Sequence, residues 1–196
     1  MSRLRVEKFT FNVFQENTYL VMNEKGNALL FDAGMQGIQE EKRFNAYFRS
    51  NLLNITGYYA THCHLDHVFG NKFVYDHFGL RPQCDFKEQQ ILDSAGDIAR
   101  MYGIQAVEIP KDSIHILADT MIQWDSTTIK LLPTPGHSPG SISFYFEEEG
   151  FLISGDVLFY DSIGRTDLPF GNHRQLMDSI NTQLFVLPDD TIVYSG

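Results

Sequence analysis

Three histidines and one aspartate within six residues form a dense group of potential metal ligands in this 196-residue chain. They are His62, His64, Asp66 and His67, in the segment Thr-His-Cys-His-Leu-Asp-His. Imidazole nitrogen and carboxylate oxygen suit a divalent ion such as Zn²⁺, and a catalytic site keeps one position open for water. A polar surface loop is the alternative interpretation, but the number and spacing of these side chains favour a catalytic metal site.

The four positions do not share one face of a helix, so we expect a tight loop to gather their side chains. The preceding run, residues 55–60, is rich in β-branched and aromatic residues and predicts the strand that leads into this loop. Cys63 lies between two predicted ligands, and in an extended segment its side chain points away from theirs. We therefore expect Cys63 and Cys84 to be reduced thiols in a cytoplasmic protein.

Length, charge and hydropathy restrict the classes of function. The length suits one domain over residues 1–196, with a core that needs no disulfide. Neither the apolar core of a signal peptide nor a run of about 18 apolar residues is present, so we expect no membrane association. A formal net charge of −10 disfavours binding to a phosphate backbone. We expect a small-molecule substrate and no nucleic acid, and the composition leaves the oligomeric state open.

Several predicted elements position the candidate ligands. Alternating apolar residues predict an opening meander of antiparallel strands over residues 4–14, 18–22 and 28–31, and the last strand ends at Asp32. A carboxylate beside a metal loop commonly accepts the second N–H of a ligating imidazole, and we predict this role for Asp32. Periodicity predicts helices over residues 37–51, 70–78, 85–102 and 173–187, and further strands over 121–125, 128–132, 141–146 and 151–154.

The pattern H-x-H-x-D-H after a short hydrophobic strand resembles the signature of the metallo-β-lactamase superfamily. Three further segments agree with this resemblance: a strand ending in Asp32-Ala33-Gly34, a turn with Gly136-His137, and a strand ending in Gly155-Asp156. The resemblance spans essentially the whole chain. Within the superfamily, the chain resembles the short glyoxalase II-like members, which are hydroxyacylglutathione hydrolase-like proteins.

The resemblance implies an α+β fold, the four-layer αββα metallo-β-lactamase sandwich, in a single domain. It assigns six residues to the metal, namely His62, His64, Asp66, His67, His137 and Asp156. One ion is expected on the first two histidines and His137, and the second on Asp66 and His67, with Asp156 bridging the two. The expected cofactor is Zn²⁺, one or two ions per chain, with Fe²⁺ as the alternative. A metal-bound hydroxide would attack the substrate, and Asp66 would orient it and relay its proton to the leaving group.

The last metal-binding histidine of the superfamily pattern is absent from the sequence. The chain ends at Ser195-Gly196, where the resemblance places Gly-His-Gly next. We therefore expect a fold that lacks its extreme C-terminus and a second ion that binds more weakly than the first.

The segment Gly164-Arg165-Thr166-Asp167 is similar to one in glyoxalase II-like hydrolases and in persulfide dioxygenases. Arg165 either pairs with Asp167 and holds this loop or binds a substrate carboxylate. The resemblance implies hydrolysis of a thioester of the hydroxyacylglutathione type, with another thioester or a lactone as alternatives. Two other functions stay open: a mononuclear Fe(II) persulfide dioxygenase with two His and one Asp as ligands, and a weakly active binding or scaffold domain.

Overall fold

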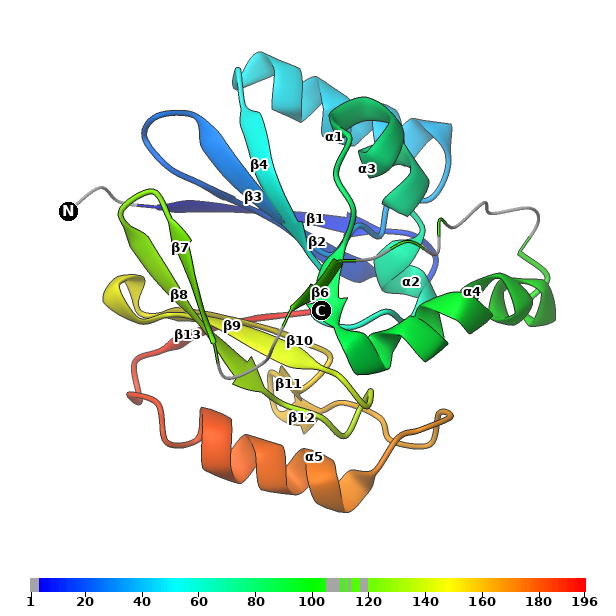
Figure 1. Cartoon of the computed structure of the whole chain (residues 1–196), viewed down its shortest axis with the longest axis vertical. Helices are drawn as coiled ribbons and strands as arrows, with labels where there is room; N and C mark the ends of the chain where they lie inside the picture. The colour runs from blue at the N-terminus through cyan, green and yellow to red at the C-terminus, as the bar shows by residue number, and fades with distance from the viewer. Residues whose placement is uncertain (1–3, 105–109, 111, 113, 117–119) are drawn as a thin grey trace. The chain divides into compact units, whose positions relative to one another are not determined.

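The computed structural model describes residues 4–104, 110, 112, 114–116 and 120–196 (Figure 1). The chain divides into two compact units. The N-terminal unit comprises Met1–Gln83 and Gln89–Ile114, and the C-terminal unit comprises Cys84–Glu88 and His115–Gly196. The short segment Cys84–Glu88 therefore packs with residues that follow much later in the chain.

A six-stranded sheet explains how Asp32 reaches the metal loop. Its strands lie in sequence order: β1 (Arg5–Phe11), β2 (Glu16–Met22), β3 (Asn27–Phe31), β4 (Asn54–Tyr59), β5 (Gln83–Asp85) and β6 (Ile114–Ile116). The predicted opening meander is present, because β1, β2 and β3 pair antiparallel. β3 and β4 are parallel, with α1 (Ile38–Ser50) as the crossover between them. Their carboxyl ends thus meet at one edge, with Asp32 on one strand and the loop after Tyr59 on the other.

Helices α1 and α3 (Asn71–Phe78) cover one face of this sheet (Figure 1). Phe44 of α1 and Phe73 of α3 are buried and meet edge-on, with ring centroids 6.1 Å apart. The strand residues buried in the same cluster are Phe9, Phe11, Leu20, Met22, Ala28, Leu30, Ile55 and Tyr58. These apolar contacts hold β3 and β4 rigidly beneath the loop that carries the candidate ligands.

Two helices differ from their predicted bounds in informative ways. The predicted helix over residues 85–102 begins as a 3₁₀ turn, Phe86–Glu88, and continues as α4 (Gln89–Met101). The predicted helix over residues 173–187 is α5 (His173–Ser179) followed by a π-helical turn, Ile180–Leu184. In both segments apolar residues recur at a spacing close to that of an α-helix. At a helix end this spacing does not distinguish an α-helix from a 3₁₀ or π-helical turn.

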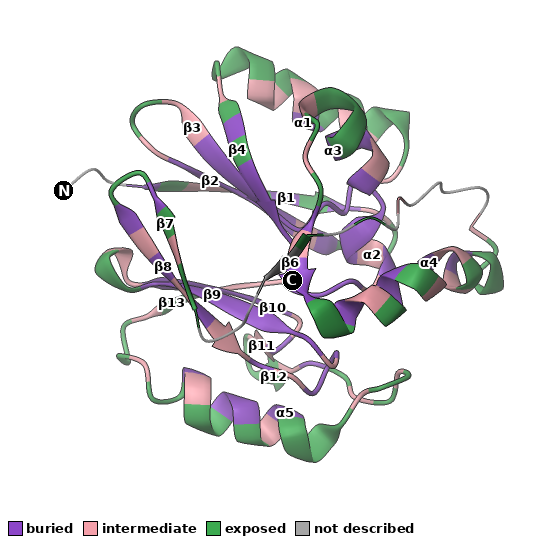
Figure 2. Cartoon of the chain, viewed as in Figure 1, coloured by how far each residue is buried: buried purple, intermediate pink, exposed green. Residues whose placement is uncertain are grey.

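The C-terminal unit contains a five-stranded sheet of order β13-β10-β9-β8-β7. Its members are β7 (Met121–Trp124), β8 (Thr127–Pro133), β9 (Ile142–Phe146), β10 (Phe151–Gly155) and β13 (Ile192–Ser195). Every residue of β9 and β10 is buried (Figure 2). Leu176 and Ile180 pack with Tyr145 and Leu152 of these strands. A short hairpin of β11 (Leu158–Phe159) and β12 (Ser162–Ile163) follows β10.

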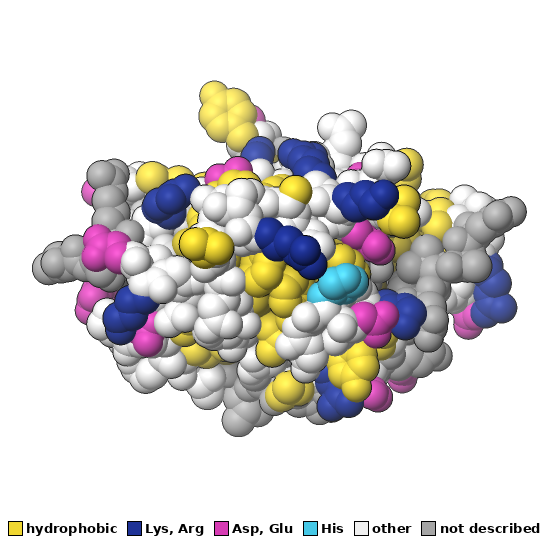
Figure 3. Space-filling model, turned by 90° about the horizontal axis from the view of Figure 1, so that it is seen from above, with side chains coloured by type: hydrophobic (Ala, Val, Ile, Leu, Met, Phe, Trp, Pro, Cys, Tyr) yellow, Lys and Arg dark blue, Asp and Glu magenta, His cyan; other side chains and the backbone are white. Residues whose placement is uncertain are grey.

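One face of the molecule carries side chains of every kind. Figure 3 shows one face, on which Lys and Arg side chains lie scattered among acidic, apolar and uncharged ones. This mixing differs from the clustered basic side chains with which proteins neutralise phosphates. Among the helices that the structure describes, none has the length and apolar character needed to cross a membrane.

Candidate metal centre

Asp32 organises the loop after β4. Its carboxylate is buried and accepts three hydrogen bonds: from the Thr61 amide N–H at 2.7 Å, from the Thr61 hydroxyl at 2.8 Å and from His67 Nδ1 at 2.9 Å. The last bond fixes Nδ1 of His67 as the protonated nitrogen and leaves Nε2 with its lone pair. The structure thus brings Asp32 to an imidazole in the manner expected of a carboxylate that supports a metal ligand.

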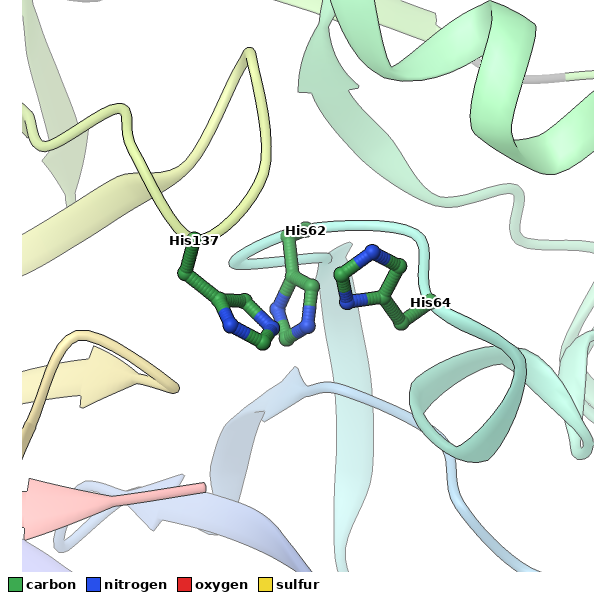
Figure 4. A group of neighbouring side chains, drawn as sticks. All are labelled: His62, His64 and His137. Atoms are coloured by element: carbon green, nitrogen blue, oxygen red, sulfur yellow. The ribbon is translucent and has the colours of Figure 1, made fainter. Parts of the chain in front are cut away.

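The segment predicted as a tight loop contains one turn of helix, α2 (Leu65–Val68). Asp66 and His67 lie on this helical turn, whereas His62 and His64 precede it in backbone that is not helical (Figure 4). The expectation that one loop holds all four residues was therefore wrong for Asp66 and His67. Four helical residues are too few to show a period in a sequence, so the turn could not be predicted from hydropathy.

The imidazoles of the N-terminal unit gather closely. The ring centroid of His62 lies 4.8 Å from that of His64 and 4.1 Å from that of His67. Both His62 and His67 are about 1% exposed. The side chain of Asp66 is 24% exposed, and its Oδ2 lies 3.9 Å from Nε2 of His67. Buried imidazoles with one ring nitrogen held by an acceptor suit a divalent metal ion, because the other nitrogen then offers its lone pair.

His137 and Asp156 come together within the C-terminal unit. His137 lies in the turn after β8 (Figure 4), and its Nδ1 donates to the carbonyl of Arg165 at 2.8 Å. Nε2 of His137 lies 3.5 Å from Oδ2 of Asp156, which follows β10. The backbone N–H of Gly164 donates to Val157 at 3.2 Å, and a Cβ at Gly164 would collide with the carbonyl oxygen of Asp156. His137 is therefore also held through Nδ1, with Nε2 directed to a carboxylate.

The Arg165 side chain pairs with Asp167. Its Nε and one terminal nitrogen donate to the two carboxylate oxygens, each at 2.7 Å. The hydrogen bond from Arg165 lowers the pKa of Asp167 to about 2. Of the two roles expected for Arg165, the structure thus shows the ion pair with Asp167. Both side chains are more than half exposed.

Glu16 is a buried acid that sequence reasoning missed. Its carboxyl group bonds the Thr18 hydroxyl at 2.9 Å and lies 3.9 Å from Nδ1 of His67. Burial raises the pKa of Glu16 well above its usual value of 4.5, and the nearby His67 opposes that shift. The signal in the sequence was weak: an acidic residue at the start of a strand reads as an ordinary turn residue.

Replacing Glu16 with glutamine is expected to stabilise the metal-free protein at alkaline pH. The raised pKa means that the folded state binds this proton more tightly than the unfolded state does. The resulting stability is fully present below about pH 4.5 and is lost as pH rises through the folded pKa. In urea unfolding with a chelator, the free energy of unfolding of Glu16→Gln should therefore exceed that of the parent at pH 8 and differ little from it at pH 4.5. A difference that grows toward low pH would contradict this account.

Comparison with known proteins agrees with these observations. Residues 11–196 match the sequence model of the metallo-beta-lactamase superfamily. The chain is 34% identical to the probable metallo-hydrolase YqgX of Bacillus subtilis (strain 168), over 93% of this chain and 84% of that protein. It is 31% identical to the hydroxyacylglutathione hydrolase GloC of Haemophilus influenzae, over 98% of this chain and 90% of that protein. It is 30% identical to the human persulfide dioxygenase ETHE1, over 90% of this chain and 61% of that protein.

Two solved structures share the fold. The BLEG-1 B3 metallo-beta-lactamase matches with a TM-score of 0.88 and 33% identity, covering 98% of this chain and 91% of that one. TTHA1623 in a di-iron-bound form matches with a TM-score of 0.86 and 30% identity, covering 97% of this chain and 91% of that one. The predicted α+β metallo-β-lactamase fold is thereby confirmed. The chain belongs to the metallo-β-lactamase superfamily.

Proposed function

We propose that the chain is a metal-dependent hydrolase of a thioester of the hydroxyacylglutathione type. The observation that carries this proposal is the buried imidazole set of the loop after β4, in which Asp32 fixes the tautomer of His67. The similarity to the hydroxyacylglutathione hydrolase GloC supports the choice of substrate class. We propose a cytoplasmic location, for which the buried thiols of Cys63 and Cys84 give support.

The proposed ligands are the six residues that the family pattern marks: His62, His64, Asp66, His67, His137 and Asp156. We propose that the first two and His137 hold one ion, and that Asp66 and His67 hold a second, with Asp156 bridging. One or two Zn²⁺ per chain would suit this donor set of imidazoles and carboxylates, and Fe²⁺ is the alternative. A bound ion would lower the pKa of water to near 7 and polarise the thioester carbonyl.

Asp66 is the proposed proton carrier. Its side chain is partly exposed, whereas the neighbouring His67 is buried, so Asp66 can meet both a water molecule and the substrate. It would orient the attacking water, accept its proton and deliver that proton to the leaving thiolate. The overall reaction consumes one water and yields a carboxylic acid and a thiol.

Arg165 is a proposed substrate contact that would require a change of partner. A substrate carboxylate would replace Asp167 in the two-pronged hydrogen bond that the structure shows. Because the pair is exposed, water can solvate Asp167 when Arg165 turns away.

A persulfide dioxygenase is the second candidate function. The similarity to the human persulfide dioxygenase ETHE1 and to an iron-bound structure supports this second function. Two histidines and Asp156 would supply the two-His, one-carboxylate set typical of Fe(II) oxygenases.

Metal analysis combined with a thioester assay tests the proposal. Purified protein is expected to hold about one to two zinc ions per chain and to hydrolyse S-D-lactoylglutathione, with activity lost on chelation and restored by zinc. Iron near one per chain, oxygen uptake with glutathione persulfide and no thioester hydrolysis would instead support the dioxygenase. Retention of full hydrolysis after complete metal removal would exclude both.

A further inference from the structure

A second buried acid, Glu88, lies against the turn that carries His137. Glu88 ends the 3₁₀ turn Phe86–Glu88, and its side chain is fully buried. Its Oε1 accepts a hydrogen bond from the Ser138 hydroxyl at 2.5 Å and another from the Gly140 amide N–H at 2.7 Å. Both donors lie within three residues of His137.

The contact between Glu88 and the turn is tight as well as polar. A Cβ at Gly140 would lie 3.0 Å from Oε1 and from Cγ of Glu88, and 3.0 Å from Cβ of Asp85. A larger residue at this position would push Glu88 or Asp85 away by a few tenths of an ångström, so glycine gives the closest approach. The Asp85 carboxylate accepts a hydrogen bond from the Lys87 amide N–H at 2.9 Å. This bond fixes the start of the 3₁₀ turn on which Glu88 lies.

The other side of the same turn has separate anchors. The carbonyl of Gly136 accepts from the Asn172 amide at 2.7 Å, and the carbonyl of Pro135 accepts from the Ser179 hydroxyl at 2.7 Å. These bonds restrain the residues before His137, whereas Glu88 restrains those after it. Orientation of the His137 ring depends on both restraints, because its Nδ1 must reach the Arg165 carbonyl for Nε2 to keep its lone pair.

We infer that Glu88 is a positioning residue for His137: its buried carboxyl group fixes residues 138–140 and thereby directs Nε2 of His137 toward the metal. This inference rests on the proposed metal role of His137. Glu88 itself is not a proposed ligand, because Ser138 and Gly140 occupy its Oε1 inside the protein.

The test uses Glu88→Ala with Glu88→Gln as the rescuing variant. Alanine removes the acceptor and is expected to weaken zinc binding at the tightest site about 10- to 100-fold, the range typical of groups that orient a ligand. Glutamine keeps a carbonyl oxygen in place of Oε1 and is expected to bind zinc within about threefold of the parent, since the two donors stay satisfied. Glu147→Ala is the matched control, because Glu147 also lies on a 3₁₀ turn of the same unit but is exposed and pairs with Lys130.

Two further measurements separate positioning from loss of folding. The ¹⁵N signals of the His137 ring in the metal-free protein report which nitrogen carries the proton; we expect Nδ1 in the parent and Glu88→Gln, and a mixture in Glu88→Ala. If Glu88→Ala does not fold, Ser138→Ala removes one of the two bonds and should give a smaller loss in the same direction. Unchanged zinc affinity and an unchanged His137 tautomer in the folded variants would overturn the inference.

These outcomes remain distinct from failure of the proposed function. A parent protein that binds zinc without hydrolysing thioesters would reject the substrate class, while the zinc titrations of the Glu88 variants would still decide the role of Glu88. A parent with full activity and a Glu88→Ala variant with equal zinc affinity would reject only the role of Glu88.

Discussion

Replacing His62 with alanine is expected to abolish thioester hydrolysis and to weaken zinc binding by more than about 100-fold. Loss of a group that merely orients a ligand costs about 10- to 100-fold, so loss of a ligand itself should cost more. His62 is also central to the imidazole group of its unit, since its ring contacts both His64 and His67. Zinc titration against a chromophoric chelator and kcat/KM on S-D-lactoylglutathione measure the two effects.

His77→Ala is the matched control for this experiment. His77 is an exposed imidazole on α3, and its Nδ1 lies 3.0 Å from the Phe73 carbonyl. We expect its zinc affinity and activity to stay within about twofold of the parent, as for most surface substitutions. Equal losses in both variants would show that the effect is not specific to the metal loop, and full activity in His62→Ala would remove His62 from the proposed ligands.

Asp32→Ala has the largest expected effect on stability. The substitution removes the carboxylate that accepts from three buried donors, two on Thr61 and one on His67. The Thr61 hydroxyl also lies 3.1 Å from Nδ1 of His62, so two donors, the Thr61 amide and His67 Nδ1, lose their acceptor outright. Each such group costs about 1–3 kcal/mol, so we expect the free energy of unfolding to fall by at least about 2 kcal/mol. Asp32 also has φ +52°, a conformation that aspartate tolerates better than alanine does. Urea unfolding of the metal-free protein measures this loss.

Asp32→Asn separates the stability effect from the effect on the metal. Asparagine has one acceptor oxygen in place of two. When that oxygen faces the Thr61 amide N–H, the N–H₂ group faces the Thr61 hydroxyl and Nδ1 of His67, which share the other carboxylate oxygen in the parent. With N–H₂ at the imidazole, the proton of His67 moves to Nε2, where it blocks metal binding. We expect a smaller loss of stability than in Asp32→Ala, with metal affinity still reduced about 10- to 100-fold. Wild-type affinity in a folded Asp32→Asn protein would contradict the assigned tautomer.

The sequence predicted the parts of the fold that rest on local pattern. The opening meander, the strand before the ligands and helix α1 follow from alternation and helical period, and each is present. Helix α2 and the two-residue strands β11 and β12 were missed, because such short elements are stabilised by tertiary contacts rather than by their own pattern.

The buried acids show where sequence reasoning about the site ended. Asp32 could be placed beside the metal loop because it follows a strand and the family pattern marks it. Glu16 and Glu88 look like surface residues of a turn and a helix start, and both are buried in the structure. Their partners are side chains and amides brought near by folding, and for Glu88 these lie 50 and 52 residues away. Only the three-dimensional structure can pair groups at that separation.

The distance between Glu88 and its partners also bears on synthesis of the chain. Translation proceeds from the N-terminus, so Glu88 leaves the ribosome 52 positions before Gly140. At about 5–20 residues per second, this residue waits roughly 3–10 s for the turn on which it packs. Residues 89–114, the second part of the N-terminal unit, are also made before Gly140. The two hydrogen bonds that bury the Glu88 carboxyl group against Ser138 and Gly140 therefore cannot form until the later turn has been synthesised.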